Sequence, residues 1–271
     1  MIKIENVETM GWGGAIRGMR NAMNSWDKSD SKFCRLSCIT TDVNLDEEAC
    51  NFMCGADLYR GFLQIGEADM KLCKNLIKAG SSDRKFMRMI HVQADVTAPL
   101  YWWKEYDTYK VGTVANSCST MHTLHKRDLT IDDFSHEHLV STSLDCLNET
   151  IKTINTTRQY FVDMKLKGDW WQMIQLLPSS YNQKRTVMLN YEVLANMYKS
   201  RRHHKLDEWH TFCDWIEGLP YSELITGGSD CPNKKITVSE ADAIAACTLS
   251  KLQNSKPTKD LISTTFPNVL D

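Results

Sequence analysis

The sequence predicts an α+β protein, and three observations support this fold class. Residues 87–96 (MRMIHVQADV) alternate side-chain types as a strand does. Residues 66–79 carry apolar side chains at helical spacing and end at Gly80, a typical helix terminator. Residues 206–220 form an amphipathic helical pattern. The 271 residues are 42% hydrophobic, enough for one large domain or two small ones.

In the first half, the predicted elements follow one another with little linking sequence. Residues 1–30 contain several glycines with no clear strand before them, so we expect turns there and not a dinucleotide-binding loop. The helix of 66–79 and the strand of 87–96 come next. Pro99 then opens an aromatic helix, since proline suits a first helical turn. The stretch TYKVGTVANSCSTMH, 108–122, is predicted as a polar loop.

The second half is predicted to be mostly helical. The predicted helices are 132–138, 144–166, 169–178, 206–220 and, after a glycine-rich linker, one that Ser239 caps before a terminal tail. Gly168 is expected to break the second of these helices, and Pro178 to end the third. Residues 184–190 are either a strand or the first part of a long helix that runs to Arg201.

Composition excludes several classes of partner. A formal net charge of -2 offers no electrostatic reason to expect nucleic acid or an anionic membrane. No stretch reaches the roughly 18 consecutive apolar residues that a membrane-spanning helix requires. The first residues lack the apolar run and cleavage site of a secretory signal. We therefore expect a cytoplasmic protein.

The cysteines allow two interpretations. Four of the ten form two C-x3-C pairs separated by eleven residues, and these are Cys34, Cys38, Cys50 and Cys54. Four thiolates could hold one tetrahedral zinc ion, although each pair is spaced more widely than a usual zinc knuckle. The alternative is a surface insertion with unpaired thiols.

Two clusters of ionisable side chains also have alternative readings. His136, Glu137 and His138 alternate in direction on a helix, so a surface cluster is favoured over a metal site. Arg201 and Arg202 begin a basic corner that three histidines extend: His203, His204 and His210. This corner is either solvated helix-end charge or a place that holds an anion. No nucleophile and base pair is evident in the sequence.

Two segments resemble the flavin-dependent thymidylate synthases. Residues 81–122 are similar to the family core, in which a strand, an A-P step and a helix lead into R-H-R-x-x-S-x-N-x-x-S-x-R. Residues 175–216 are similar to the later family pattern of L-P, N-x-R-x-L-x-[HN]-F, L-R and a closing amphipathic helix. The resemblance covers about residues 66–225. It implies a central antiparallel or mixed sheet with long helices packed on it, and assembly as a homotetramer.

This resemblance also suggests a division of the chain. Residues 1–65 are expected to be an N-terminal extension with a cysteine-rich insertion. Residues 66–225 are expected to form the thymidylate synthase-like core, and 226–271 a C-terminal helix and tail.

The matching positions imply a cofactor site and a substrate site. By resemblance, FAD would contact Asn190, Asn196, Thr113 and Lys110. By the same resemblance, a nucleotide or related heterocycle would contact Arg201, Ser119, Asn116 and Glu105. Thr113 matches the first serine of the signature only if one residue is inserted at Ala115.

Other signature positions differ from the family. The R-H-R triplet is Thr108-Tyr109-Lys110, and a glutamine of the preceding helix is Glu105. Three further arginines are replaced, by Met121, Ile174 and Glu192. Phosphate groups are bound well by bidentate guanidinium groups, which these side chains do not supply. The site is therefore predicted to suit dUMP poorly, and to suit a planar cofactor or a less anionic substrate better.

Three functional hypotheses follow. The first is a divergent flavin-dependent enzyme that transfers a methyl or methylene group to a pyrimidine nucleotide or related heterocycle. The second is a catalytically inactive homologue that serves as a nucleotide-binding or interaction protein, which the lost arginines favour. The third is an interaction module that zinc stabilises through the four N-terminal cysteines.

Overall fold

The computed structural model describes residues 2–34 and 62–227. Apart from Cys34 and Phe62, these residues belong to one compact unit. Three of the four predicted zinc ligands lie outside the described residues, and so does the helix predicted at Ser239. Cys34 ends the short strand β2 (Lys32–Cys34), which pairs with β3 (Phe62–Gln64).

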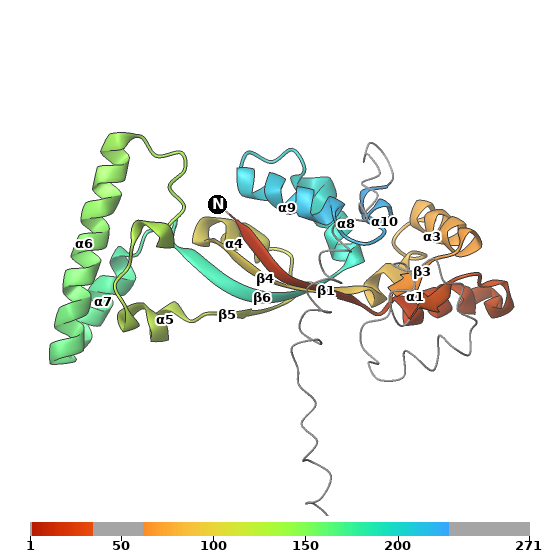
Figure 1. Cartoon of the computed structure of the whole chain (residues 1–271), viewed down its shortest axis with the longest axis horizontal. Helices are drawn as coiled ribbons and strands as arrows, with labels where there is room; N and C mark the ends of the chain where they lie inside the picture. Colours follow the sequence, from red (N-terminus) through yellow and green to blue (C-terminus); the bar gives the residue numbers. More distant parts are fainter. Residues whose placement is uncertain (1, 35–61, 228–271) are drawn as a thin grey trace, which may run out of the picture. The chain divides into compact units, whose positions relative to one another are not determined.

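A four-stranded antiparallel sheet forms the centre of the unit, in the strand order β1-β4-β6-β5 (Figure 1). Its strands are β1 (Lys3–Met10), β4 (His91–Pro99), β5 (Val114–Ser117) and β6 (Asn182–Asn190). The two central strands pair along their whole length, from His91 opposite Asn190 to Pro99 opposite Asn182. The sheet and its helices confirm the predicted α+β class.

Strand β1 was not predicted, because most of its side chains are exposed and the alternation is interrupted by an irregularity between Glu5 and Glu8. Gly11 follows it with φ +92° and leads into α1 (Trp12–Arg20). A Cβ atom at Gly11 would lie 2.0 Å from the Met89 carbonyl oxygen, so this position needs glycine. The turn prediction for 1–30 was therefore wrong over the strand and the helix.

The polar stretch 108–122 contains the edge strand β5, so the loop prediction was wrong there. All four residues of β5 are exposed, and they pair with β6 from Val114 opposite Met188 to Ser117 opposite Arg185. An edge strand with two exposed faces has no apolar alternation from which it could be predicted. The short helix α5 (Thr120–Thr123) follows it.

One face of the sheet is buried and carries the main core. Alternate residues of β4 point into it, and three helices cover it: α4 (Leu100–Tyr106), α8 (Tyr191–Arg201) and α9 (Asp207–Glu217) (Figure 1). An aromatic cluster fills the space, with the Trp102 and Trp209 ring centroids 4.7 Å apart. The predicted helices at Pro99 and 206–220 are confirmed.

The helix predicted over 66–79 is confirmed as α3 (Glu67–Ala79), and a distant segment holds its start in place. The Asp30 carboxylate accepts hydrogen bonds from the backbone N–H groups of Ala68 and Asp69, at 2.8 and 3.1 Å. The Asp69 side chain is fully buried, and Arg20 Nε donates to it at 2.5 Å. This network ties α1 to α3.

Helices α6 (Ser141–Met164) and α7 (Lys167–Leu176) pack together over a second, smaller core. The break between them is at Lys165, with φ 56°, and Gly168 lies inside α7, so its predicted role as the helix breaker was wrong. The helix predicted over 132–138 was also wrong. A 3-10 turn, η5 (Ile131–Asp133), lies at its start, where Thr130 and Asp133 form a capping box, and the backbone is extended from Phe134.

The remaining elements are short. They are the helix α10 (Glu223–Thr226) and the 3-10 turns η1 (Asn21–Met23), η2 (Trp26–Lys28), η3 (Lys85–Met89) and η4 (Leu124–Lys126). Because η3 occupies the first part of the predicted strand 87–96, β4 begins only at His91. The ambiguous segment 184–190 is a strand, within β6.

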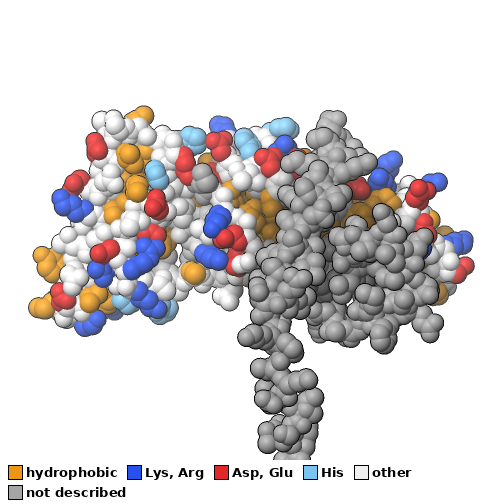
Figure 2. All heavy atoms as spheres, viewed as in Figure 1, with side chains coloured by type: hydrophobic (Ala, Val, Ile, Leu, Met, Phe, Trp, Pro, Cys, Tyr) orange, Lys and Arg blue, Asp and Glu red, His pale blue; other side chains and the backbone are white. Residues whose placement is uncertain are grey.

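Two surface properties agree with the composition. Among the described residues, no helix has the length and apolar character needed to cross a bilayer. Acidic and basic side chains are interspersed over the described part of the face in Figure 2.

Candidate functional site

The polar stretch and the end of β6 meet at Asn190. This side chain is buried, and its Oδ1 accepts a hydrogen bond of 2.9 Å from the Val193 backbone N–H, so Asn190 is the N-cap of α8. Its other end faces Gly112, where a Cβ atom would lie only 2.5 Å from Asn190 Nδ2. Gly112 also has φ +78°. The close approach and the positive φ both require glycine here.

An unsatisfied polar atom lies next to this junction. His91 is the β4 residue opposite Asn190, and its Nδ1 is buried with no hydrogen-bond partner. Most buried polar atoms in folded proteins are hydrogen-bonded, so this nitrogen is an exception. The His91 ring lies beside Gly11, because a Cβ atom added to Gly11 would be 3.6 Å from His91 Cδ2.

The other predicted residues of the polar stretch lie along the same edge. Asn116 is exposed on β5 opposite Thr186, and Lys110 is exposed in the preceding loop. Thr113 Oγ1 donates to the Tyr109 carbonyl at 2.5 Å, which closes that loop. The Ser119 carbonyl accepts from Thr123 Oγ1 at 2.6 Å at the start of α5. Gly112 is therefore the residue of this stretch that contacts Asn190, and β5 runs from there along β6 so that Asn116 lies opposite Thr186.

Asn196 is placed differently from Asn190. It is exposed on α8, six residues beyond the N-cap. Residues six apart on a helix project about 120° from each other. The two predicted flavin-contacting asparagines therefore do not face the same direction within this chain.

Arg201 lies at the end of α8 within a compact polar and aromatic cluster. Its Nη1 donates to Glu105 Oε2 at 2.5 Å, and its Nε donates to the Tyr109 hydroxyl at 2.9 Å. The guanidinium also lies over the Trp209 ring, 4.8 Å from the centroid. The predicted substrate residues Arg201 and Glu105 are therefore in direct contact with each other.

Two more donors reach the same carboxylate oxygen. Trp209 Nε1 donates to Glu105 Oε2 at 3.1 Å, and His204 Nε2 lies 3.2 Å from it. Because the Leu206 backbone N–H donates to His204 Nδ1, the proton of the neutral imidazole lies on Nε2. The Arg201 guanidinium and the Glu105 carboxylate therefore lie in this cluster as a pair of opposite charges.

A second arginine is paired with a glutamate of α8. Arg84 Nη2 donates to Glu192 Oε1 at 3.0 Å, and Arg84 Nε lies 2.9 Å from Glu192 Oε2. This ion pair has one hydrogen bond and is mostly removed from solvent. Glu192 is one of the positions where the family has arginine, and here it binds an arginine from η3.

The basic corner is also compensated. Arg202 Nη1 lies 2.6 Å from Asp214 and its Nη2 3.2 Å from Glu217. The Arg201 and Arg202 guanidiniums of this corner are therefore each paired with acidic side chains of the same chain. The His136 region is a turn, and no group of metal-ligating side chains is found within residues 2–34 and 62–227.

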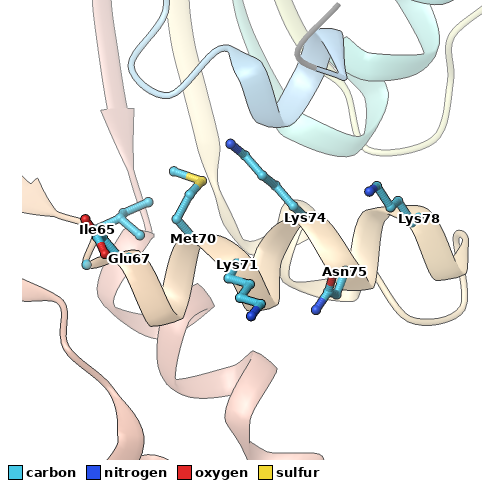
Figure 3. Close-up of a pocket in the computed structure, with 8 residues that line it drawn as sticks. Ile65, Glu67, Met70, Lys71, Lys74, Asn75 and Lys78 are labelled. Carbon is cyan, nitrogen blue, oxygen red and sulfur yellow. The ribbon is translucent and has the colours of Figure 1, made fainter.

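A separate hollow of about 470 Å³ runs along α3 (Figure 3). It is lined by Ile65, Gly66, Glu67, Met70, Lys71, Lys74, Asn75 and Lys78. Met70 and Lys74 point to one side of the helix, and Lys71 and Asn75 to the other. The hollow shares no residue with the Asn190 junction and its polar groups do not converge, so we do not assign the candidate site there.

Sequence reasoning missed three contributors to the site. Gly112 was treated only as part of a polar run. Tyr109 was treated as a changed motif position, and Trp209 only as part of the amphipathic pattern of 206–220. The positive φ of Gly112 and the hydrogen bonds of the two aromatic residues depend on contacts between distant segments. A glycine within a run of polar residues was the one local signal that could have indicated the close approach.

Sequence comparison with known proteins gives no match. No protein-family model and no curated protein matches this chain.

Comparison of structures does give matches. Two solved structures of thymidylate synthase X from Helicobacter pylori, both with FAD and dUMP, resemble the chain with a TM-score of 0.54 and 13% identity. The matches cover 83% and 82% of this chain and 96% of the other chain. The UMP/dUMP methylase PolB from Streptomyces cacaoi, bound with 5-Br dUMP, has a TM-score of 0.48 and 10% identity over 80% of this chain and 89% of its own. The chain has the fold of the flavin-dependent thymidylate synthases, which confirms the resemblance at the level of fold.

Proposed function

We propose that this chain is a divergent flavin-dependent thymidylate synthase-like protein that binds FAD and a nucleotide or related heterocycle. The observation that carries the proposal is the junction at Asn190, where the signature-like stretch meets the start of α8. The same fold in Helicobacter pylori was solved with FAD and dUMP. Within the proposal, Asn190, Asn196, Thr113 and Lys110 contact the cofactor, and Arg201, Ser119, Asn116 and Glu105 line the substrate side.

The residues at the junction fit a flavin in chemical terms. An isoalloxazine ring is planar and presents amide-like donors and acceptors, which an asparagine amide can pair with. The exposed Asn196 supplies such an amide, and the exposed Lys110 adds one cation. A bound flavin would supply hydride, while these residues would bind and orient it.

The substrate differs from dUMP in this proposal. A nucleotide phosphate requires free guanidinium groups, whereas Arg84 and Arg201 are each bound to a glutamate of the same chain. A methyl or methylene acceptor with less negative charge, such as a nucleoside or free heterocycle, is better matched to a neutral site.

The pairing of Arg84 and Arg201 with glutamates favours a second candidate function. If no acceptor reaches the site, the protein is a catalytically inactive homologue that serves as a binding or interaction protein. The paired arginines support it, because they remove the groups that would hold a phosphorylated substrate.

The resemblance also implies a homotetramer, and we include this assembly in the proposal. Several exposed apolar side chains lie near the junction of α6 and α7 and offer a surface for it: Tyr160, Met164, Leu166 and Trp171. Light scattering after gel filtration measures the mass directly. A monomer at micromolar concentration would contradict this part.

The absorbance spectrum of freshly purified protein is the first test of the proposed function. Bound flavin gives a yellow protein with visible absorption bands, and added FAD should raise the thermal midpoint. A colourless protein whose midpoint changes with neither FAD nor deoxyuridine would favour the second candidate. Turnover assays with deoxyuridine and a methylene donor then separate an enzyme from a flavin-binding protein.

A further inference from the structure

Three donors converge on one oxygen of Glu105. Arg201 Nη1, Trp209 Nε1 and His204 Nε2 lie 2.5, 3.1 and 3.2 Å from Oε2. They come from the end of α8, from α9 and from the turn between them, whereas the carboxylate comes from α4. Several N–H groups directed at a single oxyanion form an anion-binding site, and here a side chain of the protein itself occupies it.

The donors are held in place without help from Glu105. Arg201 Nε is bound to the Tyr109 hydroxyl at 2.9 Å, and its guanidinium lies over the Trp209 ring. Trp209 is fully buried, and the backbone N–H of Leu206 orients His204. Because these contacts fix the donor positions, the site should keep its geometry when the carboxylate is removed.

Glu105, in contrast, is the more exposed partner of this ion pair. Its side chain is 34% exposed, against 17% for Arg201, and it lies in the last turn of the seven-residue helix α4. Without the carboxylate, the charged Arg201 guanidinium would remain mostly buried, and so the three donors would favour another anion.

We propose that Glu105 is an internal anion that closes a three-donor oxyanion site, and that this site accepts a carboxylate or phosphate oxygen from a ligand only when the Glu105 carboxylate is absent. This inference rests on the proposed function only in placing Arg201 and Glu105 on the substrate side of the site. It goes further in naming Glu105 as the residue that excludes anionic substrates from Arg201.

Chemical rescue tests the inference without flavin or substrate. Glu105→Ala removes the internal carboxylate and leaves the donors facing a cavity. Acetate and inorganic phosphate are the probes, titrated from 0 to about 100 mM against the thermal midpoint at constant ionic strength. A ligand as small as acetate reaches millimolar affinity at best. With a Kd of about 1 mM, 100 mM acetate should raise the midpoint of the variant by roughly 5–10 °C.

Matched variants make the result specific. Asp214→Ala removes a carboxylate from Arg202, which keeps Glu217, so acetate should not stabilise that variant. Wild-type protein should also show no response, because Glu105 fills its site. Glu105→Ala combined with Trp209→Phe removes one donor while retaining an aromatic ring, and should bind acetate about tenfold more weakly than Glu105→Ala.

Each outcome decides the inference. Rescue of Glu105→Ala alone supports it, and a stronger response to phosphate than to acetate assigns the site to phosphoryl ligands. Equal responses from Glu105→Ala, Asp214→Ala and wild type show general anion effects and overturn it. If Glu105→Ala does not fold, Glu105→Ser carries the same test, and failure of both to fold in 100 mM acetate also overturns it. A colourless protein that still shows rescue contradicts the proposed function and leaves this inference standing.

Discussion

The substitution of Asn190 separates its role in folding from its proposed role in flavin binding. In Asn190→Ala the Val193 N–H loses its capping oxygen, and loss of an N-cap costs about 1 kcal/mol, with a range of 0.5–2. Val193 is buried, so water cannot fully replace the bond and the upper part of that range applies. We expect a loss of about 2 kcal/mol in the free energy of unfolding.

Asn190→Ser is the matched control, because serine caps helices about as well as asparagine but has no amide. It should unfold at nearly the wild-type urea concentration. If the amide also contacts flavin, both variants should lose a hydrogen bond to it, which weakens FAD binding by about tenfold. Asn196→Ala should lose affinity to a similar extent with almost no change in stability, since Asn196 is exposed.

Urea unfolding followed by far-UV circular dichroism measures the stability of each apoprotein. Quenching of flavin fluorescence measures affinity. Equal stability of Asn190→Ala and Asn190→Ser would refute the capping role. Unchanged FAD affinity in Asn190→Ser and in Asn196→Ala would refute their assignment to the cofactor site.

Three further predictions concern contacts around the site and the core. Gly112→Ala should destabilise the protein by about 2 kcal/mol in urea unfolding, because alanine is strained at φ +78° and its Cβ would displace the Asn190 amide. An unchanged urea midpoint would contradict the close approach of Gly112 to Asn190. Glu192→Gln should cost about 1.5–3 kcal/mol by leaving Arg84 without its carboxylate, and a double-mutant cycle with Arg84→Met should recover most of this coupling. Asp69→Asn should cost about 3–5 kcal/mol by leaving buried Arg20 unpaired. Burial acts to raise the pKa of Asp69, but hydrogen bonds from Ser29 and Ser31 and the Arg20 guanidinium outweigh it and hold that pKa below its usual value of 3.8. The stability from Asp69 is therefore fully present above about pH 4 and is lost as pH falls through the lower folded-state pKa, so the wild-type advantage over Asp69→Asn should shrink only in strong acid.

The sequence predicted the elements whose side chains alternate between core and solvent. Helices α3 and α9 have one apolar face each, and β4 alternates along its length, so their period is visible in the residues themselves. Strands β1 and β5 lie at the two edges of the sheet with mostly exposed side chains. Their strand conformation comes from backbone pairing to β4 and β6, which leaves no apolar period in the sequence.

For the candidate site, the sequence suggested individual residues but not the contacts between them. Resemblance to a family pattern assigned Asn190 to the cofactor and Arg201 and Glu105 to the substrate. It could not indicate that Glu105 binds Arg201, because the pattern has no glutamate there and the contact joins residues 96 apart. The glutamate at position 105, where the family has glutamine, was interpreted only as a change in the motif. In the structure Glu105 also forms an ion pair with Arg201.

The ion pairs lead to a prediction about substrate charge. A charge-assisted hydrogen bond from a free arginine to a phosphate contributes about 1.5–3 kcal/mol, which would favour dUMP over deoxyuridine by roughly 10- to 150-fold. In this chain Arg84 and Arg201 are each bound to a glutamate, so the phosphate gains nothing from either guanidinium. Calorimetric titration of the wild-type protein should therefore give affinities for the two ligands that agree within about threefold, and Lys110→Ala should remove any residual preference for dUMP. A preference of tenfold or more that survives Lys110→Ala would mean that the glutamates yield to the phosphate, and the neutral site proposed here would have to be abandoned.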